Sequence, residues 1–337
     1  GYLFMPENQD AVLICPAFFD YNDLIERQLK LRFSFVHSFP DMPKCSSIGK
    51  ALIKYNIVNY NSFVSRKYSE TLFNKLLVII DKISTIVIVK GTCLDSRFIQ
   101  NIKALKPNIR IVVYSWDSIV NSRGFLKLSE LADKSMSFDY ADCKKYQFEY
   151  LPLFYPDSND CDDVISIEHK MYNYSFIGSY HGDRLKLLYG LLKGNQSNIK
   201  PSFIRIYFQS RMQFCVYYFI DPYIRKCPKE WISFDIITRS VMNDIFAKSE
   251  FIIDIHHKAQ SGLTMRTWET LSLNYKLLTT NSFVLLHQPI ASIDILDRSN
   301  GNVWNDDAKK QFIAHYSIDN ISTESLSLSH WLDELLK

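Results

Sequence analysis

The sequence predicts an α/β protein of two halves, each folded around a parallel sheet, with a cleft between them. The chain has 337 residues, which is more than a single hydrophobic core usually supports. Short, continuously apolar segments alternate with segments of helical spacing, a pattern typical of parallel strands buried on both faces. A stretch rich in Pro, Asp and Asn interrupts this alternation once, and the alternation then resumes.

The first domain is predicted to span residues 1–150. Each of its strands is a short apolar run, and each helix carries apolar residues three or four positions apart. We expect strands at 11–15, 33–37, 85–90, 110–115 and 134–138, and helices at 24–31, 71–80, 95–105 and 126–131. Asp139 and Asp142, which follow the last of these strands, are interpreted as turn and cap residues.

The second domain is predicted to span residues 168–337, after a linker at 151–167. The same patterns place strands at 174–177, 202–206, 231–234, 251–255, 276–279 and 292–296, and helices at 183–192, 241–247, 264–273 and 325–336. We leave open whether the last helix packs back on the first domain. A cleft between two such domains is a common place for ligands.

The composition excludes several classes of function. A formal net charge of +3 is too small for a typical nucleic-acid-binding protein, so we expect no nucleic-acid partner. The sequence shows neither an apolar run long enough to span a membrane nor the pattern of a secretory signal peptide. Its 7 cysteines are scattered and include no CxxC pair, which predicts neither a disulfide framework nor a metal site. We therefore expect a cytoplasmic protein without a metal or other cofactor.

Residues 205–229 are rich in aromatic and basic side chains, and two interpretations of this segment remain open. Its Tyr and Phe side chains either pack in the core or lie on a helix that contacts a membrane surface or a lipid acceptor. The mildly basic charge of the chain is also compatible with a peripheral position at the inner face of the plasma membrane.

Residues 251–281 contain the densest group of residues suited to ligand binding. A buried strand leads into the loop HHKAQSG at 256–262, and this loop opens a helix. In a parallel sheet the loop lies at the carboxyl edge of the strands, where ligands bind. Free N–H groups and the positive dipole end at Gly262–Thr264 favour a phosphate or diphosphate. Gly262 permits close approach of the backbone, while Ser261 and Thr264 add hydroxyl groups.

Further side chains of this segment are candidates for contact with the same ligand. Arg266 would neutralise phosphate charge and Glu269, on the same helical face, would bind ribose hydroxyls. The alternative is a surface ion pair between these two, which contributes little to stability. His256 and His257 point to opposite faces of an extended strand end, so they are not expected to share a metal. One of them faces the ligand, or is instead a satisfied core histidine. Gln260, in the same loop, is a further candidate for contact with the ligand.

A second strand–turn–helix segment, at 175–184, has the sequence SFIGSYHGDR. Gly178 and Ser179 are placed to approach a phosphate or a sugar, and His181 and Arg184 to contact phosphate. A plain connection between a strand and a helix would look similar, since one glycine-containing turn is weak evidence.

Three polar groups follow strands of the first domain, and they include Asp20, Lys90 and Asp117. Because the carboxyl ends of parallel strands share one edge of the sheet, we expect these residues along that edge. Asp117 is the first candidate, and Asp20 the second, for a general base that removes a proton from an acceptor hydroxyl. The alternative for either carboxylate is to cap the helix that follows.

The segment IDIHHKAQSGLTMRTWETLSLNYKLLTTN resembles the C-terminal donor-site segment of bacterial GT-B glycosyltransferases from lipopolysaccharide and capsule gene clusters. The segment FDYADCKKYQFEYLPLFYP, followed by YSFIGSYHGDR, looks like the interdomain stretch and first C-terminal strand of the same group. The resemblance runs over most of the chain and is strongest across 134–184 and 250–281.

This resemblance implies two Rossmann-like domains facing across a cleft, the GT-B fold. It also implies transfer of a sugar from a nucleotide-activated donor to a lipopolysaccharide, O-antigen or capsule acceptor. The donor would bind mainly the C-terminal domain, and a lipid-linked or oligosaccharide acceptor the N-terminal one. Such enzymes usually need no metal, and a Glu in the last ligand-binding helix often holds the donor ribose, which is the place of Glu269.

The sequence departs from the group in one respect, because the EX7E spacing of the large retaining families is absent around Glu269. A retaining mechanism is therefore not carried over. Two other functions remain open. The first is a nucleotide-sugar epimerase or hydrolase on the same fold, which needs no acceptor. The second is a non-catalytic glycan-binding scaffold.

Overall fold

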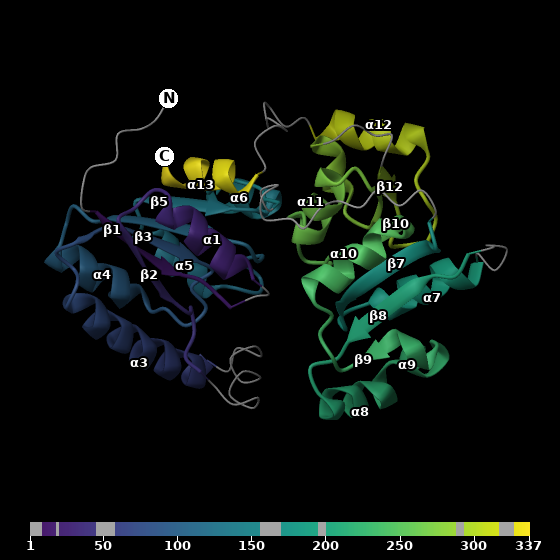
Figure 1. Cartoon of the computed structure of the whole chain (residues 1–337), viewed down its shortest axis with the longest axis horizontal. Coiled ribbons are helices and arrows are strands. Elements are labelled where there is room, and N and C mark those ends of the chain that lie inside the picture. Colours follow the sequence, from purple (N-terminus) through teal and green to yellow (C-terminus); the bar gives the residue numbers. More distant parts are fainter. Residues whose placement is uncertain are drawn as a thin grey trace. The chain divides into compact units, whose positions relative to one another are not determined.

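The computed structural model describes residues 9–17, 20–44, 58–155, 170–194, 200–287, 293–316 and 327–337. These residues form two compact units (Figure 1). Unit 1 takes the described residues of Gly1–Leu153 and Leu326–Lys337 together with Ala259–Gly262, and unit 2 takes those of Phe154–Lys258 and Leu263–Ser325. Most of the predicted linker at 151–167 lies outside the described residues.

Unit 1 is built on a six-stranded parallel sheet in the order β2-β1-β3-β4-β5-β6. Its central strands β1, β3 and β4 are buried along almost their whole length, as continuous apolar runs require. The strands of this sheet are β1 (Asp10–Ile14), β2 (Phe35–Phe39), β3 (Ile83–Val89), β4 (Arg110–Ser115), β5 (Lys134–Ser137) and β6 (Glu149–Tyr150).

Helices cover both faces of this sheet. Val113 of β4 belongs to a core cluster that the sheet shares with α3, α4 and α5. The next residue, Tyr114, points to the opposite face, where its ring packs edge-on against Trp331 of α13, with centroids 5.0 Å apart. The helices of unit 1 are α1 (Tyr21–Lys30), α3 (Val58–Leu77), α4 (Ser96–Leu105), α5 (Gly124–Ser129), α6 (Tyr140–Tyr146) and α13 (Leu328–Leu336).

Unit 2 repeats this architecture with a parallel sheet in the order β12-β11-β10-β7-β8-β9. Ile252 of β10 packs with α10 on one face, whereas the adjacent Ile253 joins a cluster with α7 and α9 on the other. The strands are β7 (Tyr172–Ser179), β8 (Phe203–Tyr207), β9 (Ile232–Ser233), β10 (Ser249–Asp254), β11 (Lys276–Thr279) and β12 (Ile293–Ile295).

The helices of unit 2 differ in how fully they are covered. α10 and α11 bury one face, whereas α8 has no fully buried residue. They are α7 (Arg184–Gly194), α8 (Arg211–Ile220), α9 (Pro222–Lys226), α10 (Arg239–Ala247), α11 (Met265–Ser272) and α12 (Asp306–His315), with short 3-10 helices η2 (Lys229–Trp231) and η3 (Ser282–Leu286).

The strands and helices predicted from the sequence are confirmed, although α3 begins at Val58, well before the predicted start at 71. The elements α6, β6, α9 and α12 were missed, and α8 corresponds to only one of the two alternatives predicted for residues 205–229. α12 buries only Lys309, so its sequence lacks the apolar periodicity that marks the other helices. α6 is less than two turns long, and its N-cap is Asp139, whose side chain accepts a hydrogen bond from the N–H of Asp142 at 3.1 Å. The predicted cap role of Asp139 is therefore confirmed.

Gly262 lies against the ring of Phe138 within unit 1. A Cβ atom at position 262 would lie 2.4 Å from Cε2 of Phe138, a side chain that is itself buried. No real Cβ contact is that short, so only glycine fits at position 262 without movement of Phe138. This requirement is independent of any contact between Gly262 and a ligand.

We therefore expect Gly262→Ala to destabilise unit 1 by about 1–3 kcal/mol, because the buried ring of Phe138 must move. Gly124→Ala, in open space at the start of α5, is the matched control and should be neutral or stabilising by up to about 1 kcal/mol. Urea denaturation followed by circular dichroism measures both. Equal stabilities for the two variants would refute the close packing.

Candidate functional site

Three arginines converge at the carboxyl edge of the sheet of unit 2, and we call them the arginine cluster. Arg184 begins α7 after β7, Arg266 lies in the first turn of α11 after β10, and Arg298 follows β12. Burial lowers the pKa of Arg184 to about 10, and the positive charges of Arg266 and Arg298 add to this effect against the opposing charge of Asp254. The three guanidinium groups therefore share one electrostatic environment.

Arg184 also holds two strand ends together. Its Nε donates a hydrogen bond to the carbonyl oxygen of Ile255 at 2.9 Å, and its Nη1 donates to that of Ser179 at 2.8 Å. These carbonyls follow β10 and end β7, two neighbouring strands. Arg184, which the sequence predicts to contact phosphate, thus has a structural role, because it holds the ends of β7 and β10 in place.

Several guanidinium N–H groups of the cluster are buried and have no hydrogen-bond acceptor in the part of the chain that the structure describes. They are Nη1 of Arg266 and both Nε and Nη1 of Arg298. The Arg266 guanidinium lies 4.6 Å over the ring of Phe246, and Nη1 of Arg298 is 3.8 Å from Asp183, too far for a hydrogen bond. Buried charged donors without acceptors are costly, so this arrangement favours an anionic ligand.

The local charge balance points the same way. Lys258 lies 3.3 Å from Asp183, and Asp254 accepts a hydrogen bond from Oγ1 of Thr267 at 2.8 Å. Lys258 and the arginine cluster carry four positive charges, against two carboxylates, Asp183 and Asp254. The excess of two positive charges matches a phosphate or diphosphate.

Three charged residues of this site, Asp183, Asp254 and Arg298, were not predicted from the sequence. Each stands at or shortly after the end of a strand, and that position is the signal that should have marked them.

His256 is a neutral hydrogen-bonding group in this site. Burial lowers its pKa to about 3, with the charges of Arg298 and Arg184 adding to the effect. Its Nδ1 lies 2.7 Å from Oγ1 of Thr280, which follows β11. The adjacent His257 instead places its ring 4.7 Å from that of His181. The two histidines thus have different surroundings, as expected of neighbours on an extended strand end.

The start of α11 differs from the expectation. The N–H groups of Ser261 and Gly262 donate to the Asp139 carboxylate at 2.7 and 3.1 Å, so the N–H of Gly262 is not free. The helix begins at Met265, so the N–H groups of its first turn start at that residue, and that of Thr267 donates to the hydroxyl of the N-cap Thr264. The helix end whose dipole would favour an anion therefore begins a few residues later than Gly262.

The other predicted polar groups of this segment also have partners within the chain. Oγ of Ser261 donates to Asp139 at 2.6 Å, and Nε2 of Gln260 donates to the carbonyl of Gly262 at 3.1 Å. The Thr264 hydroxyl caps α11 by accepting from the N–H of Thr267. A direct role of these groups toward a ligand stays a prediction.

Glu269 has an ion-pair partner that the sequence did not suggest. Its Oε1 lies 2.9 Å from Nη1 of Arg239, at the start of α10, and its side chain is only 12% exposed. Arg266 lies over Phe246 instead, so the alternative Arg266–Glu269 ion pair is wrong. Gly178 packs against its neighbours: a Cβ there would lie 2.9 Å from Cζ of Phe176.

In unit 1, Lys90 and Asp117 form an ion pair at the carboxyl edge of the sheet, with Nζ and Oδ2 3.0 Å apart. Lys90 has a φ of 64° and the following Gly91 a φ of 67°, and a non-glycine residue in this region stores strain. This turn therefore holds Lys90 toward Asp117. Oδ1 of Asp117 also accepts from the N–H of Ser118 and from Nδ2 of Asn121.

The same edge includes two further carboxylates. Asp20 is the N-cap of α1, but its side chain makes no capping hydrogen bond, so the proposed alternative as a side-chain cap is wrong. Asp41, which follows β2, was missed by sequence analysis. It accepts from the N–H of Thr92 at 2.9 Å, its Oδ1 has no described partner, and burial raises its pKa.

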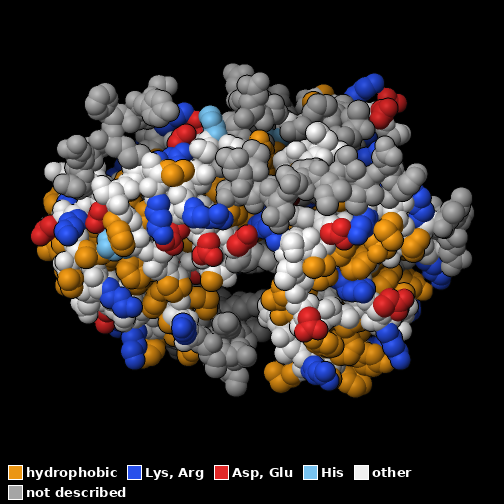
Figure 2. Space-filling model, in the orientation of Figure 1, with side chains coloured by type: hydrophobic (Ala, Val, Ile, Leu, Met, Phe, Trp, Pro, Cys, Tyr) orange, Lys and Arg blue, Asp and Glu red, His pale blue; other side chains and the backbone are white. Residues whose placement is uncertain are grey.

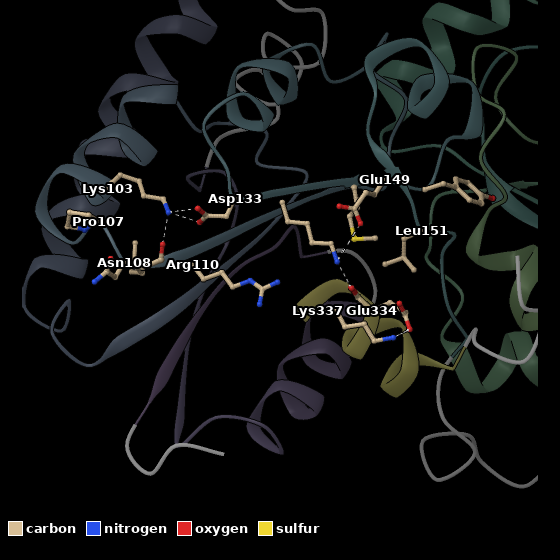
Figure 3. Close-up of a pocket in the computed structure, with 13 residues that line it drawn as sticks. Lys103, Pro107, Asn108, Arg110, Asp133, Glu149, Leu151, Glu334 and Lys337 are labelled. Atoms are coloured by element: carbon tan, nitrogen blue, oxygen red, sulfur yellow. Dashed lines mark hydrogen bonds and ion pairs between the residues drawn. The ribbon is translucent and has the colours of Figure 1, made fainter. Parts of the chain in front are cut away.

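A charged cavity of about 890 Å³ opens at the opposite, amino edge of the same sheet (Figure 3). Most of its charges are internally paired: Lys103 faces Asp133 at 2.6 Å, and Lys337 faces Glu334. The Arg110 side chain is the exception, since it has no hydrogen-bond or ion-pair partner among the described residues, although its backbone pairs with β3. This cavity offers an anion a second binding place, separate from the arginine cluster.

The described residues show neither a metal-binding cluster nor a membrane-spanning helix. They contain no group of three or more His, Cys, Asp or Glu side chains placed to hold a metal ion. Among them, no helix has the length and apolar character needed to cross a membrane.

The fold is similar to that of solved glycosyltransferases. An α-glucosyltransferase in complex with UDP and a 13-mer DNA matches with a TM-score of 0.54 and 13% identity, over 92% of this chain and 90% of that one. Sucrose-phosphate synthase from Thermosynechococcus elongatus matches with a TM-score of 0.53 and 9% identity, over 97% and 94%. No protein-family model and no curated protein matches the sequence. The predicted α/β fold of two Rossmann-like units, GT-B, is confirmed.

The lowered pKa of His256 predicts a loss of stability in acid. Between about pH 6.5 and pH 3, His256 is protonated in the unfolded chain but stays neutral in the folded chain. The folded state is therefore destabilised relative to the unfolded state as the pH falls. For one histidine the loss between pH 7.5 and pH 5 is about 2 kcal/mol.

We expect His256→Gln to narrow the difference in unfolding free energy between pH 7.5 and pH 5 by about this amount. His315→Gln, at the exposed end of α12, is the control for loss of a histidine. Urea titrations at both pH values measure the difference. An unchanged difference in the His256 variant would show that His256 is not shielded from protons.

Proposed function

We propose that this chain is a glycosyltransferase that uses a nucleotide-sugar donor, with a bacterial surface-glycan precursor as acceptor. The observation that carries the proposal is the arginine cluster, with its buried N–H groups that have no acceptor in the described chain. A donor diphosphate supplies both the oxygens and the negative charge that these groups require. The fold gives further support, because it is also the fold of a solved α-glucosyltransferase that holds UDP.

In the proposed donor complex, Arg266 and Arg298 donate to the diphosphate, together with the N–H groups at the start of α11. Arg184 adds charge while it holds the ends of β7 and β10 together. Glu269, oriented by Arg239, accepts from the ribose hydroxyls. The arginines stabilise the charge that develops on the leaving diphosphate, so we propose a reaction that needs no metal ion.

The remaining predicted donor contacts complete this arrangement. We propose that Gly178 and Ser179 line the approach of the donor after β7, and that His256 hydrogen-bonds it as a neutral side chain. His257, Gln260, Ser261, Gly262 and Thr264 are proposed to shape the loop that precedes α11.

We further propose that Asp117 is the general base. It removes the proton of the acceptor hydroxyl, whose oxygen then bonds to the anomeric carbon of the sugar as the bond to the diphosphate breaks. Lys90, whose Nζ lies 3.0 Å from Oδ2 of Asp117, holds the carboxylate in place. Asp20 is the second choice for this role. The proposed acceptor is lipid-linked or an oligosaccharide, and the proposed location is the cytoplasm, with contact to the inner face of the plasma membrane.

The two rival functions make different demands. A nucleotide-sugar epimerase or hydrolase would convert its substrate without an acceptor. A glycan-binding scaffold would bind glycans and keep its function after loss of Glu269 and Arg266. A transferase turns over only when both donor and acceptor are present.

Nucleotide binding is the first test. The purified chain is melted with UDP, GDP, CMP, dTDP and their sugar conjugates, and at about 100 times the dissociation constant a ligand should stabilise it by roughly 2.7 kcal/mol. We expect one nucleotide to raise the melting temperature, and Arg298→Gln and Glu269→Ala to weaken its binding at least tenfold, because each removes a proposed contact.

Arg110→Gln is the matched control, since Arg110 lines the charged cavity at the amino edge of unit 1. Its binding should equal that of the unmodified chain. Loss of binding in this variant alone would move the nucleotide site to that cavity, and no shift with any nucleotide would overturn the donor assignment.

The role of Asp117 predicts a separation of binding from turnover. Asp117→Asn should lower the transfer rate by about 100- to 10,000-fold, the usual contribution of a general base, while the nucleotide-induced melting shift is kept. Asp133→Asn, which removes another carboxylate paired with a lysine in unit 1, should leave the rate unchanged. Radiolabelled sugar transfer to a lipid-linked acceptor measures the rate. Full activity of the Asp117 variant would exclude it as the base.

A further inference from the structure

The helix α8 of unit 2 presents a stripe of large apolar side chains to solvent. Met212, Val216, Phe219 and Ile220 are 74%, 52%, 81% and 67% exposed. Their spacing of four, three and one positions places all of them on one helical face. We call these four residues the α8 stripe.

The opposite face of α8 is apolar too, and it is the face that packs on unit 2. Phe214 contacts the buried ring of Phe208 edge-on, with centroids 5.2 Å apart, and Tyr217 packs against Tyr180. A helix that is apolar on two opposite faces is expected to be covered on both. Within the described residues the core covers only the face of Phe214 and Tyr217, and the α8 stripe is exposed.

Basic side chains lie near both ends of α8. Exposed cations occur at the start of α8 and on the segment that follows it. The exposed acids there are Glu230 and Asp235, whereas Asp221 is occupied in capping α9 and accepting from Tyr180. Figure 2 shows hydrophobic side chains gathered over this end of unit 2, with both basic and acidic side chains at their margin. The cations are Arg211, Arg225, Lys226 and Lys229.

We propose that the α8 stripe docks unit 2 on a membrane surface that contains anionic lipids. The apolar side chains enter the boundary between headgroups and acyl chains, and the nearby cations contact the lipid phosphates. The charge favours this occupant, because the four exposed cations outnumber the exposed acids Glu230 and Asp235, and a purely apolar protein partner would leave that excess unmatched. The inference concerns a surface separate from the arginine cluster and does not depend on the donor site.

Vesicle sedimentation with the full chain tests the proposal. The chain should bind phosphatidylcholine vesicles that contain phosphatidylglycerol, and bind less to phosphatidylcholine alone. Replacing both Met212 and Phe219 with Ser should lower the partition coefficient by roughly 100-fold, about tenfold for each large apolar side chain withdrawn from the lipid. Phe63→Ser on α3, where the side chain is 64% exposed, is the matched control and should bind normally.

The cations give a second, independent readout. Arg225→Gln and Lys226→Gln should each weaken binding roughly fivefold at low salt, and the effect should vanish on neutral vesicles. Equal binding of the Met212/Phe219 double variant and the unmodified chain overturns the proposal, as does absence of binding to either vesicle. A chain that dimerises through α8, shown by a monomeric double variant in sedimentation velocity, also overturns it in favour of a second copy. The nucleotide melting shift, measured on the same variants, confirms their folding and tests the donor site separately.

Discussion

Each unit of this protein depends on the constraint that a parallel sheet must be covered on both faces. The central strands are apolar on both sides, so helices must return the chain from the carboxyl end of one strand to the amino end of the next. All loops that leave strands consequently gather along one edge of each sheet. In unit 2 this edge receives the residues that follow β7, β10, β11 and β12, and in unit 1 it receives the Lys90–Asp117 pair. Polar and charged side chains are concentrated at this edge because the strands themselves are buried among apolar side chains.

The arginine cluster shows what a site of this kind costs the folded chain. Placing Arg184, Arg266 and Arg298 near one another opposes folding, both by mutual repulsion and by loss of hydration. Asp254 offsets part of that cost and is itself held by Thr267. Nη1 of Arg266 and two N–H groups of Arg298 remain without an acceptor in the described chain. A structure selected for stability alone would satisfy these donors, so the proposed anionic ligand gives them a physical reason.

Local packing sets other features of the site independently of any ligand. Gly262 is held against Phe138, where no larger residue fits, and its N–H is donated to Asp139. Arg184 joins two strand ends while contributing its charge. The α8 stripe is the opposite case, since its apolar side chains are exposed where the core leaves them uncovered. For Gly262, Arg184 and the α8 stripe alike, the residue type in the sequence suggests a function, but the surrounding side chains decide how it is interpreted.

The sequence alone determined the strands, most helices and the fold, because these follow from local patterns: apolar runs such as β3, helical periodicity, and capping residues such as Asp139. It also located the carboxyl edges at which the candidate ligand-binding residues lie, since these edges are where strands end. Only the tertiary structure decided which strand ends are neighbours. Gly262 and Asp139 are 123 positions apart, and Glu269 meets Arg239 across 30 positions. Partnership over such separations depends on sheet order and on the packing of helices, which no local pattern encodes.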